Sequence, residues 1–399
     1  MTAKKLMIVQ GGGPTTVFNA SLVSAIEEAA RPHRFRQVIG ARSGALGLAQ
    51  GDTIDLTELS ATQLQLLRNT PGAALGSSRF KPTEEDLNRE LDSLRRLDVH
   101  YLLFMGGNGT MRGAALFSDF CCANGFEVNL IGVPKTVDND LAGTDRSPGY
   151  ASAARYVAQS TQELGLDLRS LPQPVTILET MGRSVGWLAA ASTLAQAHPS
   201  DAPQLVCIPE IPFEQEAFLD ALEHLISRHG WAVVVVAEGI RNPDGTMVYE
   251  LADPAQQDPL KRPLTGGVSQ HLAGIVAKNL KLRCRSERPG LLGRASMAHL
   301  SQQDLDDAIL VGAAGVHALL AGETGKMVSL LPLGSGNESH QLVPIAEVAG
   351  IERTIPASWL TSGPLAVSDA FRNYLRPLIG NLNQYAPEFA PAAASPGAR

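Results

Sequence analysis

The sequence predicts an α/β protein whose mostly parallel sheets carry helices on both faces. Short apolar runs, typical of buried strands, alternate with segments of helical period along residues 5–320. Such alternation produces β-α-β units with right-handed crossovers. Glycine-rich turns follow several of the apolar runs, and 399 residues are too many for one ordinary core. We therefore expect two domains of this class.

The first half of the chain holds strand–helix pairs in close succession. Continuous apolar runs predict the strands, and an apolar face predicts each helix. The expected strands are 5–10, 38–41, 101–105 and 128–133, and the expected helices are 19–30, 84–97, a helix beginning at 113, and 151–164.

The second half continues this pattern, with strands expected at 175–178, 205–208 and 231–237 and helices at 187–195, 214–227, 269–280 and 302–320. Residues 241–265 contain four prolines and are expected to form a loop or linker. Residues 281–294 are dense in arginine, which is typical of a solvated basic surface as well as of an anion site. The end, residues 386–399, is rich in alanine and proline and is expected to be a disordered tail.

The composition excludes several functional classes. A formal charge of −7 argues against broad nucleic-acid binding, so an anionic substrate must be held by local cations and backbone amides. The apolar run near the N-terminus is too short for a signal peptide or a membrane span. Four scattered cysteines form no disulfide or metal-ligand pattern, which indicates a reducing cytoplasm.

The stretch 128–140 combines a strand with a reactive loop. The apolar run ends at Pro134, and Lys135, Thr136, Asp138 and Asp140 follow within six residues. Open α/β proteins place their chemistry at the carboxyl ends of such strands. A lysine can neutralise phosphoryl oxygens, while carboxylates can take a proton or hold magnesium. A plain polar loop is the alternative for the stretch taken alone.

Two strand–glycine–helix junctions predict anion cradles. Residues 11–16 and 106–110 each follow a buried strand and precede a helix, whose free N-terminal amides favour negative charge. Arg79 ends the small-residue stretch 71–79, and Arg183 follows the strand 175–178. An arginine in either place can clamp a phosphoryl group with two hydrogen bonds. Several loops lining one site fit the pattern better than separate tight turns.

These motifs together resemble the phosphofructokinase family over about residues 5–327. The matching residues are Gly11-Gly-Gly-Pro with Asn19, Gly76-Ser-Ser-Arg79, Gly107-Asn-Gly-Thr110, Pro134-Lys-Thr-Val-Asp-Asn-Asp140, Met181-Gly-Arg183, Glu238, Arg285 and Arg294. The resemblance implies two Rossmann-like three-layer domains. We expect a donor-binding domain over 1–140, completed by about 255–320, and a sugar-binding domain over 141–254, completed by about 321–385.

The resemblance also implies a role for each matching residue. Asp138 would be the base that takes the proton of the acceptor hydroxyl, and Arg79 would bridge the donor and the transferring phosphoryl group. Asn108 and Asp140 would hold Mg²⁺. The implied donor-binding residues are Gly11, Gly12, Gly13, Arg79, Gly107, Asn108, Gly109, Thr110 and Gly113. The implied sugar-binding residues are Thr136, Val137, Asp138, Met181, Gly182, Arg183, Glu238, Arg285, Leu291 and Arg294, with Arg285 serving a neighbouring subunit of a homodimer or homotetramer.

Gly109 and Lys135 give conflicting indications of the phosphoryl donor. Pyrophosphate-using members of the family carry an aspartate where this chain has Gly109, which favours ATP here. Lys135 is typical of pyrophosphate users, and the small Gly113 is typical of ATP users. We expect ATP as the donor, with pyrophosphate as the alternative.

The acceptor side departs from the family pattern as well. Pro174 stands where many members carry an arginine for the sugar 6-phosphate, and Leu291 stands where a histidine or tyrosine is usual. Asn108 replaces a usual aspartate. The expected reaction is cytoplasmic, Mg²⁺-dependent phosphorylation of fructose 6-phosphate at its 1-hydroxyl, in glycolysis.

Other readings of the motifs stay open. The acceptor could be another sugar, a polyol or a nucleoside, and Gly106–Thr110 also resembles the phosphate loop of NAD and lipid kinases. Those kinases lack a stretch like 134–140. A regulatory subunit that binds sugar phosphate without turnover is the non-enzyme alternative, against which the presence of both Asp138 and Asp140 argues.

Overall fold

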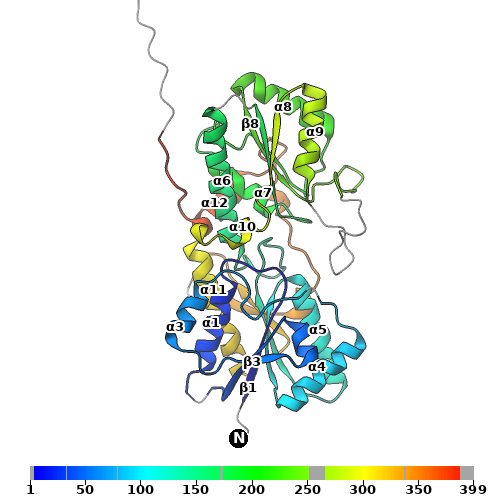
Figure 1. The fold of residues 1–399 in the computed structure, drawn as a ribbon, viewed down its shortest axis with the longest axis vertical. Helices are drawn as coiled ribbons and strands as arrows, with labels where there is room; N and C mark the ends of the chain where they lie inside the picture. Colours follow the sequence, from blue (N-terminus) through cyan, green and yellow to red (C-terminus); the bar gives the residue numbers. More distant parts are fainter. Residues whose placement is uncertain are drawn as a thin grey trace, which may run out of the picture.

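The protein consists of two α/β lobes stacked along its long axis (Figure 1). The computed structural model describes residues 4–32, 34–78, 80–170, 174–250, 266–336 and 338–386. The expected tail lies outside this part from residue 387 onward, as does most of the expected loop 241–265. Among the described residues, no helix has the length and apolar character needed to cross a membrane.

The first lobe is built on a seven-stranded sheet in the order β11-β10-β5-β4-β1-β2-β3. The five inner strands pair in parallel, and the two edge strands β3 and β11 pair antiparallel to their neighbours. The strands are β1 (Lys5–Gln10), β2 (Gln37–Ala41), β3 (Thr53–Asp55), β4 (Tyr101–Gly106), β5 (Asn129–Pro134), β10 (Lys326–Leu330) and β11 (His340–Pro344).

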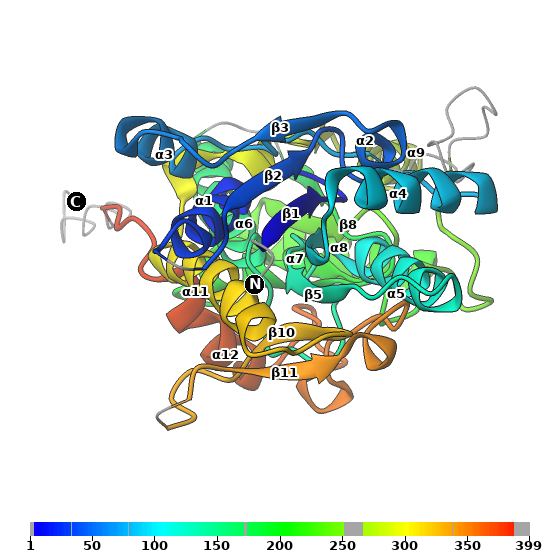
Figure 2. The ribbon, with the colours of Figure 1, turned by 90° about the horizontal axis from the view of Figure 1, so that it is seen from below.

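Both faces of this sheet are covered, because successive side chains of each strand point to opposite sides. Leu6 and Ile8 pack in one buried cluster with the helices α1 and α11, whereas Met7 and Val9 pack in another with α4 and α5. Figure 2 shows the two groups of helices on opposite sides of the strands. The helices of this lobe are α1 (Phe18–Ala29), α2 (Ala45–Gln50), α3 (Ala61–Arg68), α4 (Glu84–Leu97), α5 (Asn108–Ala123) and α11 (Gln302–Leu320).

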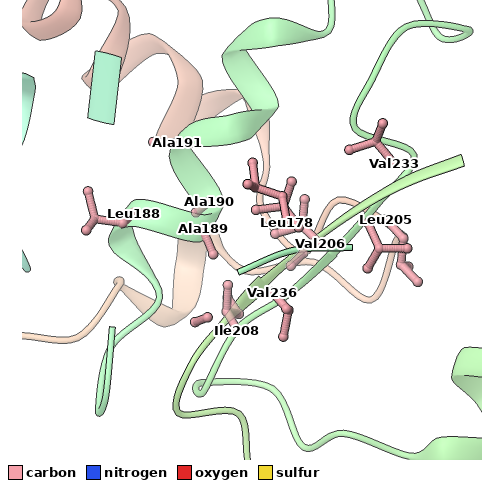
Figure 3. Packing of buried hydrophobic residues seen from close by; sticks show 14 of the residues in the cluster. Leu178, Leu188, Ala189, Ala190, Ala191, Leu205, Val206, Ile208, Val233 and Val236 are labelled. Carbon is pink, nitrogen blue, oxygen red and sulfur yellow. The ribbon is translucent and has the colours of Figure 1, made fainter. Parts of the chain in front are cut away.

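The second lobe contains a four-stranded parallel sheet in the order β7-β8-β6-β9. Every residue of β8 is buried, as expected for a parallel strand covered on both faces. Figure 3 shows Leu178, Val206 and Val236 of the sheet close together, with Ala189 beside them. The elements are β6 (Val175–Thr180), β7 (Leu205–Cys207), β8 (Ala232–Ala237), β9 (Cys284–Glu287), α6 (Tyr150–Ser170), α7 (Trp187–Ala191), α8 (Gln215–His229), α9 (Val268–Leu280), the short α10 (Leu292–Ala295) and α12 (Asp369–Ile379).

Two segments lie in the other lobe from the one we expected. Residues 326–330 and 340–344, expected in the second domain, form β10 and β11 and extend the first sheet beside β5. Residues 268–287, expected in the first domain, form α9 and β9 and extend the second sheet beside β6. The reason is the short connection in each case: α11 packs on the first sheet and leads directly to β10, and α9 packs on the second sheet and leads directly to β9.

A buried carboxylate joins the two lobes behind the loop that follows β5. Asp304 of α11 accepts hydrogen bonds from the backbone N–H groups of Gly149 (2.8 Å) and Ser152 (3.0 Å), at the beginning of α6. These N–H groups have no partner within their own helix. Burial raises the pKa of Asp304 to about 6. Asp304 therefore fixes where the chain enters the second lobe.

Candidate active site

Three loops lie side by side at the carboxyl edge of the first sheet. The strands β1 and β4 are neighbours in the sheet. The chain continues from β1 to β2 on one side of this pair and from β4 to β5 on the other side. Such a switch point is where open α/β sheets bind ligands. The N–H of Gly11 donates to the carbonyl of Met105 (2.8 Å), and the N–H of Lys135 donates to the carbonyl of Gly106 (3.0 Å). The structure thus brings together the predicted loops 11–13, 107–110 and 135–140.

The glycines of the first two loops leave room that no other residue would leave. A Cβ atom on Gly11 or Gly106 would lie 2.4 or 2.3 Å from the hydroxyl oxygen of Thr110. Gly12 has a φ of 77°, which other residues rarely adopt. The backbone can therefore approach a ligand closely at this edge. The cleft beside it is lined by Gly12, Gly13, Pro14, Ala73, Gly76, Ser77, Ser78 and Arg294.

Lys135 is buried behind the first glycine loop. Its ammonium group donates to the carbonyl oxygen of Gly13 (2.7 Å) and lies 4.7 Å from the centre of the Phe18 ring. Burial lowers the pKa of Lys135 to about 8, while the negative charges of Asp140 and Asp138 oppose the shift. A cation in this place can neutralise a phosphoryl group bound in the cleft.

Asp138 is the most strongly perturbed carboxyl group of the site. Burial raises its pKa to about 7, and the negative charges of Asp140 and Glu238 add to the shift. One of its carboxylate oxygens, Oδ1, is buried and has no hydrogen-bond partner. A carboxylate that keeps an oxygen without a partner and a pKa near neutrality is suited to accept a proton from a bound hydroxyl group.

Asp140 is held on three sides by hydrogen bonds. Its Oδ1 accepts from the Thr136 hydroxyl (2.8 Å), and its Oδ2 and backbone carbonyl accept from the Asn108 amide (3.1 and 2.9 Å). These bonds use the amide nitrogen of Asn108 and leave its Oδ1 buried without a partner. Asn108 and Asp140 can therefore offer oxygens to a cation.

The donor set fits magnesium only if the ion also takes oxygens from a ligand. Among the described residues, no cluster of three or more His, Cys, Asp or Glu side chains could hold a metal ion. Magnesium is usually bound by one or two protein carboxylates together with substrate phosphates and water. The unpartnered oxygen of Asn108 beside the Asp140 carboxylate fits that arrangement.

Gly109 and Gly113, the two small residues that favour ATP as the donor in the sequence, both face open space. A Cβ atom added at either position would meet no atom within 4 Å. The space beside the start of α5 is therefore large enough for a larger side chain or for part of a ligand.

The second lobe contributes the ends of two adjacent strands. Thr180 and Ala237 are in register, and the N–H of Glu238 donates to the carbonyl of Thr180 (3.0 Å). Gly182, with a φ of 134°, accepts from the N–H of Gly239 (3.1 Å), so the turn carrying the half-buried Arg183 is tied to the turn after β8.

The two lobes meet at this site. The charge of Glu238 contributes to the raised pKa of Asp138, and Arg294 contributes to the pKa values of both Lys135 and Asp138. Val137 and Met181 both pack against the hydrophobic cluster of the second lobe. A small pocket next to Met181 is lined by Ala153, Tyr156, Val157, Leu178, Glu179, Thr180, Leu188, Pro289, Gly290 and Gly293.

Two predicted residues lie away from this site within the chain, and the first of them, Arg285, is the residue expected to serve a neighbouring subunit. Arg285 is exposed and pairs with Thr176 on β6, four residues before the carboxyl end of that strand at Thr180. This places Arg285 on the order of 13 Å from the strand end. Leu291 is 65% exposed and does not line the pocket next to Met181, and its expected sugar contact stays a prediction. Arg79 lies outside the described residues.

Sequence reasoning also missed contacts that shape the site. The Ser77 hydroxyl donates to the carbonyl of Gly12 (2.6 Å), and its place in the motif 76–79 was the available signal. The contact between Phe18 and Lys135 could not be predicted, because an apolar residue at the start of a helix is ordinary. Arg353 and Tyr374 lie more than 200 residues from the loop 135–140, and no motif marks them.

The family model, the sequence relatives and the solved structures that resemble this chain all point to the same family. The family model for phosphofructokinase matches residues 5–319. A pyrophosphate–fructose 6-phosphate 1-phosphotransferase from Xanthomonas campestris is 37% identical over 389 residues, covering 95% of this chain and 92% of the relative. An ATP-dependent 6-phosphofructokinase 3 from Streptomyces coelicolor is 31% identical over 362 residues, covering 87% and 99%. The crystal structure of a pyrophosphate-dependent phosphofructokinase from Marinobacter aquaeolei superposes with a TM-score of 0.84 at 32% identity, covering 97% of this chain and 94% of that one. The chain belongs to the phosphofructokinase family.

Proposed function

We propose that this protein transfers a phosphoryl group from pyrophosphate to the 1-hydroxyl of fructose 6-phosphate, giving fructose 1,6-bisphosphate and phosphate. The observation that carries the donor assignment is the buried ammonium of Lys135 against the Gly12–Gly13 loop, beside Asp138. The pyrophosphate-using relatives from Xanthomonas and Marinobacter support the same donor. The proposal therefore prefers the donor that the sequence alone ranked second.

The reaction would proceed by direct displacement. Asp138 accepts the proton of the 1-hydroxyl, the hydroxyl oxygen attacks the terminal phosphorus of pyrophosphate, and the bond from that phosphorus to the bridging oxygen breaks. Lys135, Arg294 and the N–H groups of the glycine loops neutralise the charge on the transferring group. We assign the donor to Gly11, Gly12, Gly13, Gly107, Asn108, Gly109, Thr110 and Arg79, and the sugar to Thr136, Val137, Met181, Gly182, Arg183 and Glu238.

Magnesium would bind together with the donor. Asn108 Oδ1 and the Asp140 carboxylate would supply its protein oxygens, and pyrophosphate and water the rest. The ion would supply positive charge to the phosphate oxygens. The Thr136 hydroxyl would keep the Asp140 carboxylate oriented.

ATP is the second candidate donor, and the open space at Gly109 favours it. Nothing in the described structure occupies the volume into which a side chain at 109 would project, so a nucleotide has room there. The matched test is Gly109→Asp, which adds a negative charge at the start of α5 without a steric clash. We expect this variant to retain pyrophosphate activity within a few fold and to lose any ATP activity by about a hundredfold or more through charge repulsion. An equal loss of activity with pyrophosphate and with ATP would contradict the proposal that a nucleotide fits into the space beside Gly109.

The function is tested by an activity matrix on the purified protein. Pyrophosphate and ATP are each assayed with fructose 6-phosphate, sedoheptulose 7-phosphate, inositol and a nucleoside. We expect the highest kcat/KM for pyrophosphate with fructose 6-phosphate; higher values for ATP, or for another acceptor, would overturn the corresponding part of the proposal. Absence of transfer with every pair would favour a regulatory sugar-phosphate-binding subunit.

The base is tested by Asp138→Asn, which keeps the shape of the side chain. We expect kcat to fall by roughly 10² to 10⁴, the usual contribution of a general base. Asp119→Asn, at an exposed position of α5, is the control and should retain normal activity. Near-normal turnover of the Asp138 variant would remove the base assignment.

We further propose a cytoplasmic homo-oligomer, a dimer or tetramer. Arg285 is exposed on β9 and lies away from the sugar-binding turns of its own chain, so it can contact a sugar phosphate only in a neighbouring subunit. Light scattering of the purified protein measures the number of subunits.

A further inference from the structure

The loop that carries Asp138 and Asp140 is held from behind by two residues from the C-terminal part of the chain. Arg353 follows β11, and Tyr374 lies on α12. Both lie beyond residue 319, where the match to the family model ends. Their contacts converge on Asn139, the residue between the two carboxylates.

Asn139 is in a left-handed conformation that its surroundings hold. Its φ is 54°, a region that costs most residues roughly 1–2 kcal/mol but that asparagine adopts more readily than most residues other than glycine. The side chain is 1% exposed. Its Oδ1 accepts from the N–H of Ser147 (3.1 Å), its Nδ2 donates to the Tyr374 hydroxyl (3.1 Å), and its carbonyl accepts from the Arg353 guanidinium (3.4 Å). Every polar group of the side chain therefore has a partner.

Tyr374 joins the two ends of the loop with one oxygen atom. Its hydroxyl accepts from Asn139 Nδ2 and donates to the carbonyl of Asp145 (2.8 Å). The ring packs against the hydrophobic cluster of the second lobe, 5.8 Å from the centre of the Trp187 ring. The hydroxyl group therefore couples the loop to the core of the other lobe.

Arg353 supports the same loop through both its backbone and its side chain. Its N–H donates to the carbonyl of Asp140 (2.8 Å), and its own carbonyl accepts from the Trp187 indole N–H (3.1 Å). The guanidinium carbon lies 4.3 Å from the centre of the Trp187 ring. A stacked arginine has few accessible rotamers, so the donor to Asn139 is fixed in place.

We propose that Tyr374 and Arg353 are positioning residues for the phosphoryl-transfer reaction. By holding Asn139 in the left-handed conformation, they set the direction in which the two flanking carboxylates point. A backbone that relaxed at Asn139 would turn Asp138 away from the acceptor hydroxyl, and misplacement by about 1 Å can cost a hundredfold in rate. This inference rests on the proposed role of Asp138 as the base.

The first test compares Tyr374→Phe with Tyr385→Phe. Each change removes one tyrosine hydroxyl from the C-terminal part of the chain, but the Tyr385 hydroxyl donates to Glu163 on α6, outside the loop. We expect Tyr374→Phe to lower kcat tenfold or more with the KM for fructose 6-phosphate within about threefold of wild type, because the sugar-binding turns of the second lobe stay in place. Tyr385→Phe should leave both constants unchanged. Equal kcat values for wild type and Tyr374→Phe would overturn the proposal.

A second comparison separates the effect of the backbone conformation at residue 139 from a general loss of folding. Asn139→Gly can adopt the left-handed conformation without strain, whereas Asn139→Val cannot. We expect the glycine variant to retain at least tenfold more kcat than the valine variant, and Arg353→Lys, which loses the stacked fork, to resemble Tyr374→Phe. Equal activity of the glycine and valine variants would contradict the proposed role of the conformation.

Crystal structures of wild type and Tyr374→Phe give a readout that does not depend on turnover. We expect φ of residue 139 or the separation of the Asp138 and Asp140 carboxyl carbons to change in the variant. An unchanged loop would overturn the positioning role even if the protein proved active. Conversely, an inactive wild type or a fully active Asp138→Asn would remove the proposed function, while a shifted loop would still establish what holds residue 139.

Discussion

Lys135 and Asp138 lie three residues apart, and burial brings their pKa values close together. The pKa of the carboxyl group rises to about 7 and that of the ammonium falls to about 8. In the proposed reaction, Asp138 must be ionised to take a proton, and Lys135 must be protonated to neutralise phosphate. The active protonation state is therefore most populated between the two values.

This predicts a narrow bell-shaped pH profile for kcat/KM. Activity should fall as pH drops through about 7, because Asp138 becomes protonated, and should fall again as pH rises through about 8, because Lys135 loses its proton. The measurement is kcat/KM from pH 5.5 to 9.5, corrected for the ionisation of the substrates. A flat profile between pH 6 and 9 would mean that neither group titrates in the free enzyme.

Residues that are close in sequence could be predicted, and residues joined only by the fold could not. Lys135, Thr136, Asp138 and Asp140 form one loop after one strand, so their grouping follows from the chain itself. Asn139 contacts Tyr374 across 235 positions, and an ordinary tyrosine on an amphipathic helix gives no sign of this. Leu291 differs from both: its place in a motif suggested a sugar contact, but its side chain is exposed in this chain, so the contact stays a prediction.

Among the elements, the apolar strands and the helices α4 and α11 agree closely with expectation, whereas α5 begins at Asn108 rather than 113 and α6 continues to Ser170 rather than ending at 164. α4 and α11 have the predicted bounds, because a capping residue precedes each of them: Thr83 and Ser301 accept from backbone N–H groups of the first turn. The strands β3, β9, β10 and β11 were not predicted. They have three to five residues each, and no residue of β9 or β11 is buried, so no continuous apolar run marks these two.

The helix α4 carries a buried carboxyl group without a charged partner. Glu90 is 1% exposed, and burial raises its pKa from 4.5 to about 8, with a smaller contribution from Asp86. Below about pH 4.5 the group is protonated in both the folded and the unfolded chain. Between 4.5 and 8 only the unfolded chain is ionised, so the free energy of unfolding falls as pH rises through this interval.

Replacing this group should therefore flatten the pH dependence of stability. We expect Glu90→Gln to remove a loss of roughly 3 to 5 kcal/mol in the free energy of unfolding between pH 5 and pH 9, from a shift of about 3.5 pKa units. Urea unfolding at several pH values measures this, with Glu84→Gln on the exposed face of the same helix as the control. A Glu90 variant whose stability falls with pH as steeply as wild type would refute the assignment.

At the scale of the molecule, the fold class was predictable and the path of the chain was not. The two three-layer α/β domains with mostly parallel sheets follow from the alternation of strands and helices, and their presence is confirmed. The division into segments depended on which sheet each late strand joins. That choice is made by the helix before each strand: α11 packs on the first sheet and leads directly to β10, and α9 packs on the second sheet and leads directly to β9.

The C-terminal part beyond the family match is expected to be essential for folding. A chain ending at Leu320 lacks β10, β11 and α12, including the buried side chains Phe371, Leu375, Leu378 and Ile379. Each buried side chain of this size contributes about 1.5–3 kcal/mol, so the loss approaches the whole stability of a typical domain. We expect this truncation to give aggregated protein in size-exclusion chromatography, and a truncation after residue 386 to remain folded. A folded, active 320-residue chain would contradict the structure.

β10 is synthesised long after its neighbour β5, and this has a consequence while the chain is still on the ribosome. When β5 has left the ribosome, roughly 200 further residues must be made before β10 and β11 can cover its edge. At typical elongation rates this takes about 10 to 40 s, during which the nascent sheet exposes a parallel strand with unpaired backbone groups. Such an edge is a template for pairing with other chains. Chaperone binding to nascent chains between these two points is therefore expected to protect the protein from aggregation.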